Sequence, residues 1–408
     1  MKKTLWTFDF TVITIGTIIS AIGSVAMSFA LSLVVFDETQ STWLTGVFTA
    51  VSFIPSVVIP LLVAPYVDKH NRKHLIVRLD MLSGILYLIF TIYLLNNDFS
   101  YYMYLLFTVL IGSIGAIYNL AYSSLYPELI PQGFAQKGYS ISSVIYPSVV
   151  AFVTPIASFM YISFGIVSVC LLEGILLLGA SFFEHLIRYQ EHRDSTEDTY
   201  TLKTYKEDIF EGLGYLKKEK GIRNIYSYMA VSNGSAQGIS LMMQAFFQSS
   251  TIFTVTMYAF LSTAEMAGRI CGSIFHYFVK IPAKRRFDIA ASVYVSYEAL
   301  DMMLLFIAYP LMIVNRFTAG FLGINSLNIR EASTQNYIPS NMRARVNAFF
   351  SVIVAFCTLG ARLLAGLLGE LFPFAYVCLF FASLSMIAVL FIVIRNRNTI
   401  KPIFNQDI

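Results

Sequence analysis

The chain has 408 residues, of which 57% are hydrophobic and only 13% are charged. Its mean hydropathy of +0.67 is too apolar for a soluble domain, because such a domain needs a wetted polar surface. The formal net charge of +4 comes from bases placed between apolar stretches, and it does not indicate a nucleic-acid partner. The composition therefore excludes a water-soluble globular protein and predicts a chain that lies almost wholly in a lipid bilayer.

Apolar stretches of about 20 residues, the length that spans a bilayer, recur between short polar clusters. They predict an all-α membrane protein with twelve transmembrane helices, near residues 8–36, 43–67, 74–95, 101–124, 138–162, 165–187, 222–247, 252–279, 286–308, 310–331, 343–369 and 372–394. The joins near Phe164 and Tyr309 are tight. The expected organisation is an N-terminal six-helix bundle over 1–187, a linker over 188–221, a C-terminal six-helix bundle over 222–394 and a tail over 395–408.

The linker contains a second kind of helical pattern. Thr204 and Glu207 have the spacing of a capping box, and apolar residues recur at helical spacing from Leu202 to Leu216. This pattern predicts an amphipathic helix along the cytoplasmic face of the membrane. A solvated tether between the two bundles is the alternative.

The basic residues indicate the orientation of the helices. With both termini in the cytoplasm, no Lys or Arg falls in an external loop, and turns such as 37–42 and 96–100 carry only acidic or neutral residues. Because Lys and Arg collect on the cytoplasmic side, we expect a multi-pass protein of the cytoplasmic membrane with both termini inside.

The loop after the second predicted helix carries the most specific motif, Ala64-Pro65-Tyr66-Val67-Asp68-Lys69-His70-Asn71-Arg72-Lys73. A small residue, an acid, a base and then paired bases at this spacing resemble the signature loop of the major facilitator superfamily, with Ala64 in place of the usual glycine. The resemblance implies the fold of that superfamily. It also implies a conformational latch, in which the carboxylate faces a helix terminus and bases at the start of the eleventh helix. The latch residues are Asp68, Lys69, Arg72, Lys73, Arg343 and Arg345. The alternative is that these charges serve only as topology signals.

More of the chain is similar to the macrolide-efflux and multidrug-efflux branch of the superfamily. Residues 207–225 are acidic and then basic, and residues 338–353 also have the character of that branch. The resemblance implies a secondary active transporter that works by alternating access, most simply an antiporter for proton-coupled efflux of a drug-like or amphipathic compound. Two features depart from the branch: Ile111 stands before Gly112 where an arginine is usual, and the fifth helix keeps only Pro155 of a glycine-proline pair.

Ionisable residues at membrane depth are costly and are therefore functional candidates. Glu265 and Arg269 lie four apart on one helix face, which suits an ion pair. Either a proton exchanges at Glu265 while Arg269 changes partner, with Glu173 as a second proton site, or the charges form a neutral structural network. That buried charge network would also include Glu298, Asp301, Arg316 and Arg362.

Polar residues within the predicted helices are candidates for the substrate cavity: Asn119, Tyr122, Asn233, Gln237 and Asn325. Each is also explained by helix packing. The four cysteines lack metal-site spacing and there is no phosphate-binding loop, so we expect no metal, no cofactor, no catalytic residues and no enzyme activity. The expected partners are a small-molecule substrate, the bilayer and a proton gradient, with a monomer as the working unit. The alternatives to efflux are a proton-coupled uptake symporter and a non-transporting membrane receptor or partner protein.

Overall fold

The computed structural model describes residues 4–131, 134–189, 202–279 and 281–406, without the side chains of a few positions in these ranges, Asp68 and Lys69 among them. Nearly all of the described chain is helical, and it contains no strand. The chain forms two compact units. The first comprises Met1–Glu38 and Val51–Leu202, and the second comprises Thr39–Ala50 and Lys203–Ile408.

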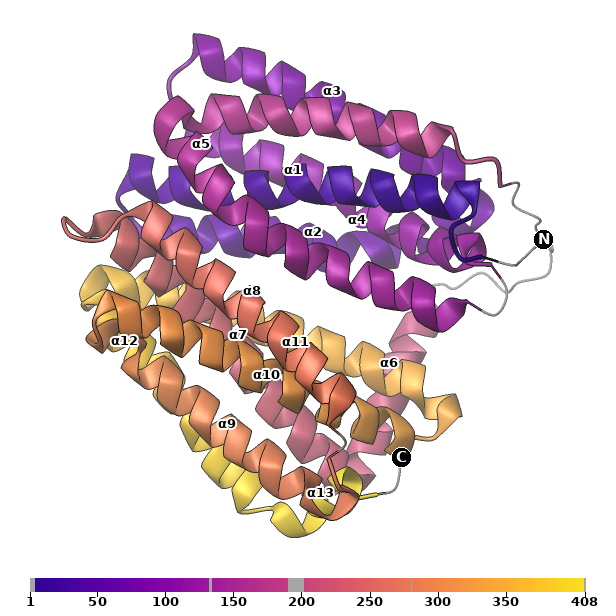
Figure 1. The fold of residues 1–408 in the computed structure, drawn as a ribbon, viewed down its shortest axis with the longest axis vertical. Helices are drawn as coiled ribbons and strands as arrows, with labels where there is room; N and C mark the ends of the chain where they lie inside the picture. Colours follow the sequence, from indigo (N-terminus) through magenta and orange to yellow (C-terminus); the bar gives the residue numbers. More distant parts are fainter. Residues whose placement is uncertain (1–3, 132–133, 190–201, 280, 407–408) are drawn as a thin grey trace. The chain divides into compact units, whose positions relative to one another are not determined.

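The first unit is built from five helical elements (Figure 1): α1 (Phe8–Thr39), α2 (Thr42–Lys69), α3 (Arg72–Asn96), α4 (Tyr101–Leu129) and α5 (Ala135–His185). The start of α2, up to Ala50, belongs to the second unit. Asn71 caps α3 by accepting a hydrogen bond from the His74 amide at 3.0 Å. Gly165, at φ 71°, interrupts α5 with a backbone conformation that favours glycine. The 51 residues of α5 would extend about 77 Å as one straight helix, which is more than twice a bilayer core of roughly 30 Å. The tight join predicted near Phe164 is thus confirmed, and α5 consists of two helical segments that meet at Gly165.

The second unit contains the remaining helices: α6 (Leu202–Lys218), α7 (Lys220–Ser249), α8 (Val255–Phe278), α9 (Arg286–Met303), α10 (Tyr309–Tyr337), α11 (Ser340–Leu371), α12 (Phe374–Ala388) and α13 (Arg397–Phe404). Val389–Ile394 continues α12 as a π-helix. Thr254 caps α8 through the Met257 amide at 3.3 Å. Pro339 and Pro373 directly precede α11 and α12, where a missing backbone donor costs nothing.

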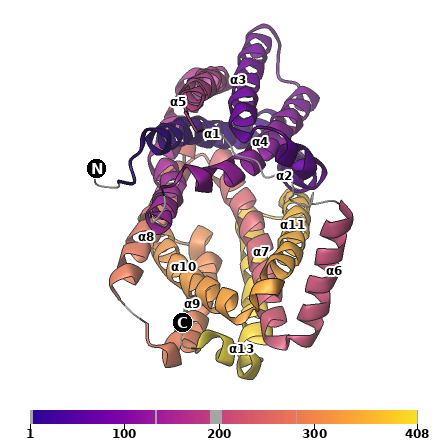
Figure 2. The ribbon, with the colours of Figure 1, turned by 90° about the vertical axis from the view of Figure 1, so that its right-hand side faces the viewer.

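Helices α6 (17 residues) and α13 (8 residues), both labelled in Figure 2, lie outside the predicted membrane spans. The helix expected in the linker is present as α6. It contacts α11 through a Glu211–Arg345 ion pair of 2.5 Å, and its Leu216 is buried in the core of the second unit. In α13, Ile400 and Phe404 are fully buried in the core of the second unit. The expected tail therefore includes a short helix that packs into this unit.

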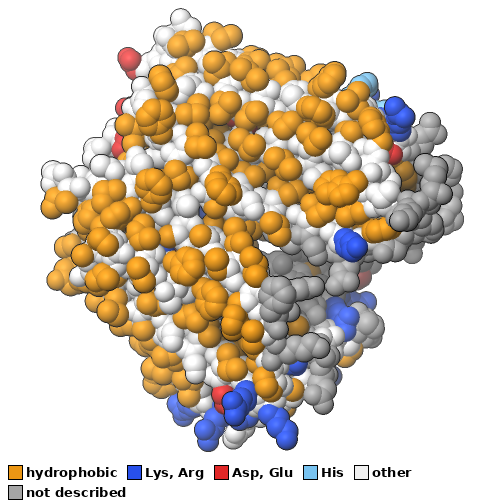
Figure 3. All heavy atoms as spheres, viewed as in Figure 1, with side chains coloured by type: hydrophobic (Ala, Val, Ile, Leu, Met, Phe, Trp, Pro, Cys, Tyr) orange, Lys and Arg blue, Asp and Glu red, His pale blue; other side chains and the backbone are white. Residues whose placement is uncertain are grey.

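The outer faces of the helices are apolar, as a lipid environment requires. Ile92 on α3, Phe152 on α5 and Phe356 on α11 are between 61% and 73% exposed, and apolar side chains cover much of the surface in Figure 3. Among the described residues, eight segments are long and apolar enough to cross a membrane. They do not include α7, α8 or α10, which carry more polar or charged residues. The count of twelve spans stays a prediction.

Candidate functional site

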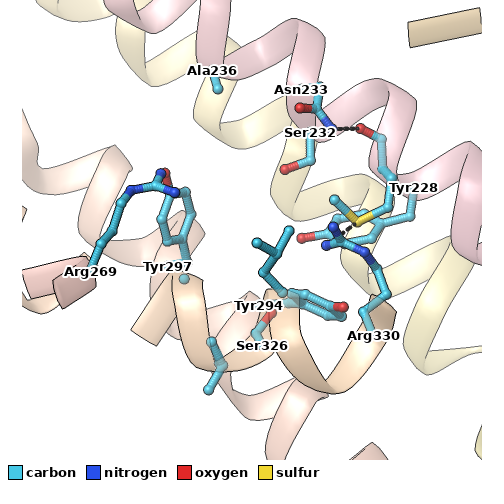
Figure 4. Close-up of a pocket in the computed structure, with 13 residues that line it drawn as sticks. Tyr228, Ser232, Asn233, Ala236, Arg269, Tyr294, Tyr297, Ser326 and Arg330 are labelled. Atoms are coloured by element: carbon cyan, nitrogen blue, oxygen red, sulfur yellow. Dashed lines mark hydrogen bonds between the residues drawn. The ribbon is translucent and has the colours of Figure 1, made fainter. Parts of the chain in front are cut away.

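A cavity of about 190 Å³ lies within the second unit, between α7, α8, α9 and α10 (Figure 4). Arg269 of α8 and Arg330 of α10 line it. The other polar lining side chains are Tyr228, Ser232 and Asn233 of α7, Tyr294 and Tyr297 of α9, and Ser326 of α10. Figure 4 shows Arg269 with Tyr297 at one end and Arg330 with Tyr228 and Tyr294 at the other.

A close crossing of α8 and α10 positions the charges beside this cavity. A Cβ atom on Gly268 would lie 2.0 Å from the Phe317 carbonyl oxygen, and one on Gly320 would lie 2.0 Å from that of Glu265. Only glycine allows the two backbones to approach this closely, which is how helices pack tightly in membranes. The crossing brings Glu265 and Arg269 of α8 next to Arg316 of α10.

Four of the predicted membrane charges form one cluster at this crossing. Arg269 donates to the Glu265 carboxylate from Nη2 at 2.9 Å and from Nε at 3.3 Å. Arg316 pairs with Asp301 of α9, and its Nη1 lies 3.9 Å from Glu265 Oε2. Arg316 and Asp301 are each 3% exposed, whereas the side chain of Arg269 is 34% exposed. Two acids and two bases balance, and the partly exposed Arg269 connects the cluster to the cavity.

The other two residues of the predicted network lie outside this cluster. Glu298 Oε1 accepts hydrogen bonds from Ser385 at 2.6 Å, Ser232 at 3.3 Å and Tyr228 at 3.4 Å. Arg362 donates to the Gln237 side chain at 2.7 Å and to the Thr49 carbonyl at 2.6 Å. These hydrogen bonds join Glu298 and Arg362 to neutral groups and not to the cluster of Glu265, Arg269, Asp301 and Arg316.

The predicted cavity residues are similarly divided. Asn233 lines the cavity, whereas Gln237 binds Arg362 and Asn325 donates to the Phe321 carbonyl at 2.7 Å. Asn119 and Tyr122 belong to the first unit, where Asn119 is exposed and the Tyr122 hydroxyl hydrogen-bonds Thr17 at 2.8 Å. Arg330 and the three tyrosines were not among the candidates. Arg330 follows Gly323 and Ser326 at spacings of seven and four on α10, and this helical spacing is the sequence signal for a shared face.

The first unit holds three buried acids in a different environment. Glu173 accepts from the Ser24 hydroxyl at 3.4 Å, and Glu184 accepts from the Tyr118 hydroxyl at 2.6 Å. One oxygen of each, and one oxygen of Asp80, has no hydrogen-bond partner among the described residues. Glu173 was predicted as a second proton site, and the structure places it only 2% exposed. Asp80 on α3 was not singled out from the sequence.

The structure describes four of the six side chains of the predicted latch. The side chains of Asp68 and Lys69 lie outside the described residues. Arg72 pairs with Glu128 at 3.0 Å, and Lys73 donates to the Ile187 carbonyl, both within the first unit. In the second unit, Arg343 donates to the Ile338 carbonyl at 3.0 Å, and Arg345 pairs with Glu211.

Metal ligands do not gather anywhere in the described chain: no group of three or more His, Cys, Asp or Glu side chains there is placed to hold an ion. The four cysteines are free thiols.

Comparison with known proteins agrees with the helical architecture. A model of the Major Facilitator Superfamily matches residues 13–297, which is more than half of the chain. Macrolide efflux protein A of Streptococcus pyogenes is 22% identical over 229 residues, and its counterpart in serotype M6 of that species matches equally. The match covers 54% of this chain and 54% of the efflux protein, so the chain spans about half the length of the curated relatives it matches.

Solved structures of transporters share the fold over almost the whole chain. The nucleoside transporter NupG has a TM-score of 0.68 at 13% identity, with 95% of this chain and 99% of NupG covered. The POT family transporter PepTSo has a TM-score of 0.67 at 14% identity, with coverages of 97% and 98%. A bacterial homologue of the lysosomal transporter Spinster has a TM-score of 0.63 at 13% identity, with coverages of 99% and 98%. At these identities the likeness shows the fold alone.

Proposed function

The chain belongs to the Major Facilitator Superfamily, a family of membrane transporters and not of enzymes, and we propose that it moves a small amphipathic molecule together with a proton. One observation carries the proposal: Arg269 lines the cavity and is hydrogen-bonded to Glu265 at 2.9 Å. A ligand that binds this guanidinium competes with the carboxylate for it. Substrate binding and proton binding are therefore coupled through one side chain.

The sign of this coupling follows from electrostatics. Arg269 and Arg316 both lie near the Glu265 carboxylate and balance its charge. When a ligand takes Arg269, Glu265 keeps Arg316 at 3.9 Å, and a proton replaces the positive charge that the carboxylate has lost. By thermodynamic reciprocity, a protonated Glu265 releases Arg269 and strengthens ligand binding. Ligand and proton thus favour each other, which is the linkage of a symporter driven by an inward proton gradient.

Export by proton antiport is the second candidate, and the match to Macrolide efflux protein A favours it. Antiport requires that ligand and proton exclude each other. The acids of the first unit suit that role better than Glu265, because Glu173 has an oxygen without a hydrogen-bond partner among the described residues. In this version, Glu173 carries the proton and a conformational change links it to the cavity.

In the proposed transport cycle, the two halves of the chain move relative to each other. The family fold supports alternating access of two six-helix bundles over 1–187 and 222–394, joined by the linker over 188–221. The absence of bases from the expected external loops supports both termini, including the tail over 395–408, lying in the cytoplasm. We assign Asp68 and the bases around it to the latch, and we take the monomer as the working unit.

A cellular assay separates the two directions. The protein is expressed in a pump-deficient bacterial host, and the accumulation of chemically diverse amphipathic compounds is measured with and without a protonophore. Symport predicts raised accumulation of at least one compound, and antiport predicts lowered accumulation. Both effects should disappear when the proton gradient is collapsed. Substrate movement that survives the protonophore unchanged would refute proton coupling.

A further inference from the structure

We propose that the cavity between α7, α8, α9 and α10 binds an amphipathic organic anion, with its oxyanion on Arg330, its apolar body against the tyrosines and its far end toward Arg269. The inference deepens the proposed function, because it names the chemical class of the substrate. Its starting point is the charge of the lining. Arg269 and Arg330 both line the cavity, and none of its thirteen lining residues is an acid.

Arg330 has hydrogen-bonding capacity left on its cavity side. It is 7% exposed, and it contacts Glu331 through Nε at 3.3 Å and Nη2 at 3.0 Å. Its Nη1 donates to the sulfur of Met229 at 3.1 Å (Figure 4). A thioether is a weak acceptor, so a guanidinium nitrogen in the cavity is held by a group that an oxyanion outcompetes. The side chain of Glu331 is 49% exposed, so the ion pair of Arg330 is screened by solvent on that side.

A second observation also points to an acceptor-bearing ligand. The hydroxyl of Tyr294 is buried and has no hydrogen-bond partner among the described residues, and the side chain is only 6% exposed. It lies close enough to Arg330 to interact with the guanidinium electrostatically. Buried donors are normally satisfied, because an unmade hydrogen bond costs free energy. A ligand oxygen between Tyr294 and Arg330 would satisfy both groups.

The acids near the cavity are already engaged and leave little to attract a cation. Glu265 is held by Arg269 and Arg316, and Glu298 accepts from three hydroxyl groups. Glu331 does not line the cavity. A cationic ligand would therefore enter beside two guanidinium groups with no lining carboxylate to pair with it.

The rest of the lining sets the size and polarity of the ligand. Tyr228, Tyr294 and Tyr297 offer ring faces, and Val293 and Leu327 add apolar surface. The volume of about 190 Å³ lies below the roughly 300 Å³ at which drug-sized pockets begin. The cavity thus suits one ring or two fused rings with an acidic group, or the acidic end of a longer molecule.

The test compares ligands of one shape and different charge. Binding of 1-naphthoate, 1-naphthamide and 1-naphthylmethylamine to the purified full-length protein in lipid nanodiscs is measured by titration calorimetry at pH 7.4. We expect the carboxylate to bind at least about tenfold more tightly than the amide, and the amine to bind more weakly still. Equal affinities for the three compounds would overturn the proposal. So would failure of 1-naphthoate, benzoate and 4-phenylbutyrate all to bind the wild type.

Two variants and a control locate the site. R330Q should weaken 1-naphthoate binding at least about tenfold, and R330K should retain part of the affinity, because lysine keeps the charge and loses the planar fork. R223Q is the control, since Arg223 is exposed on α7 and does not line the cavity. Unchanged affinity in R330Q, or an equal loss in R223Q, would place the anion elsewhere and overturn the proposal.

This binding assay is independent of transport, because no gradient is present. A carboxylate that binds as expected while its transport ignores the protonophore keeps this inference and refutes proton coupling. Proton-driven transport of substrates regardless of their charge would keep proton coupling and refute this inference.

Discussion

Neutralising Glu265 distinguishes a coupling carboxylate from a structural one. In Glu265→Gln the amide imitates the protonated acid. We therefore expect the variant to fold and to exchange preloaded substrate, but to lose gradient-driven transport. The structure also predicts how much stability is lost. Arg269 is one-third exposed and can turn to water, and Arg316 keeps Asp301. We therefore expect a decrease of only about 1–2 kcal/mol in the free energy of unfolding.

Asp301→Asn is the matched comparison. It leaves Arg316, which is 3% exposed, with Glu265 at 3.9 Å as its nearest acidic partner among the described residues. Breaking a buried pair in this way costs about 3–5 kcal/mol. Unfolding of the purified variants in mixed detergent micelles, followed by circular dichroism, measures both losses.

The structural alternative makes a different prediction for the same variants. If Glu265 only neutralises its arginine neighbours, Glu265→Gln should be as destabilising as Asp301→Asn, and the double variant with Arg269→Gln should recover stability and uphill transport. That combination of results would refute the coupling role of Glu265. Glu173→Gln would then be the next variant to test.

Three further predictions concern packing, the latch and topology. Gly268→Ala should destabilise the second unit by at least about 2 kcal/mol, measured in the same unfolding assay, because its Cβ would meet a backbone oxygen at 2.0 Å. Gly360→Ala, with nothing within 4 Å, should be tolerated. Asp68→Asn should reach wild-type expression but transport far more slowly, and a wild-type rate at equal expression would remove the latch. A single cysteine placed in the 37–42 turn should react with an impermeant maleimide added to intact cells, whereas one near Ser195 should not. Labelling of both would contradict the predicted topology.

The sequence predicts the positions of the helices well, because each long apolar run in the local sequence corresponds to a helix. The break at Gly165 was expected near Phe164, since a mostly apolar stretch of about fifty residues is too long for one membrane span. The Glu265–Arg269 contact was also predictable, because residues four apart on a helix face each other.

Contacts between distant parts of the chain were not predictable in the same way. Glu298 receives its hydroxyl partners from Ser232 and Ser385, which lie 66 and 87 residues away in sequence. Arg330 lies at the end of the predicted helix over 310–331, where a base resembles a membrane flank. The structure extends α10 to Tyr337, so Arg330 lies well inside the helix and lines the cavity. Tertiary packing, which a single sequence does not reveal, decides these partners.

A count of the protons taken up or released when ligand binds tests coupling through Arg269 and Glu265 most directly. A carboxylate that binds the purified protein is added in weakly buffered solution with a pH indicator, to the wild type and to Glu265→Gln. We expect the wild type to take up protons on binding, because the ligand draws Arg269 away from Glu265, and the variant to take up none. Proton release by the wild type, or equal uptake by both proteins, would contradict coupling through Arg269 and Glu265.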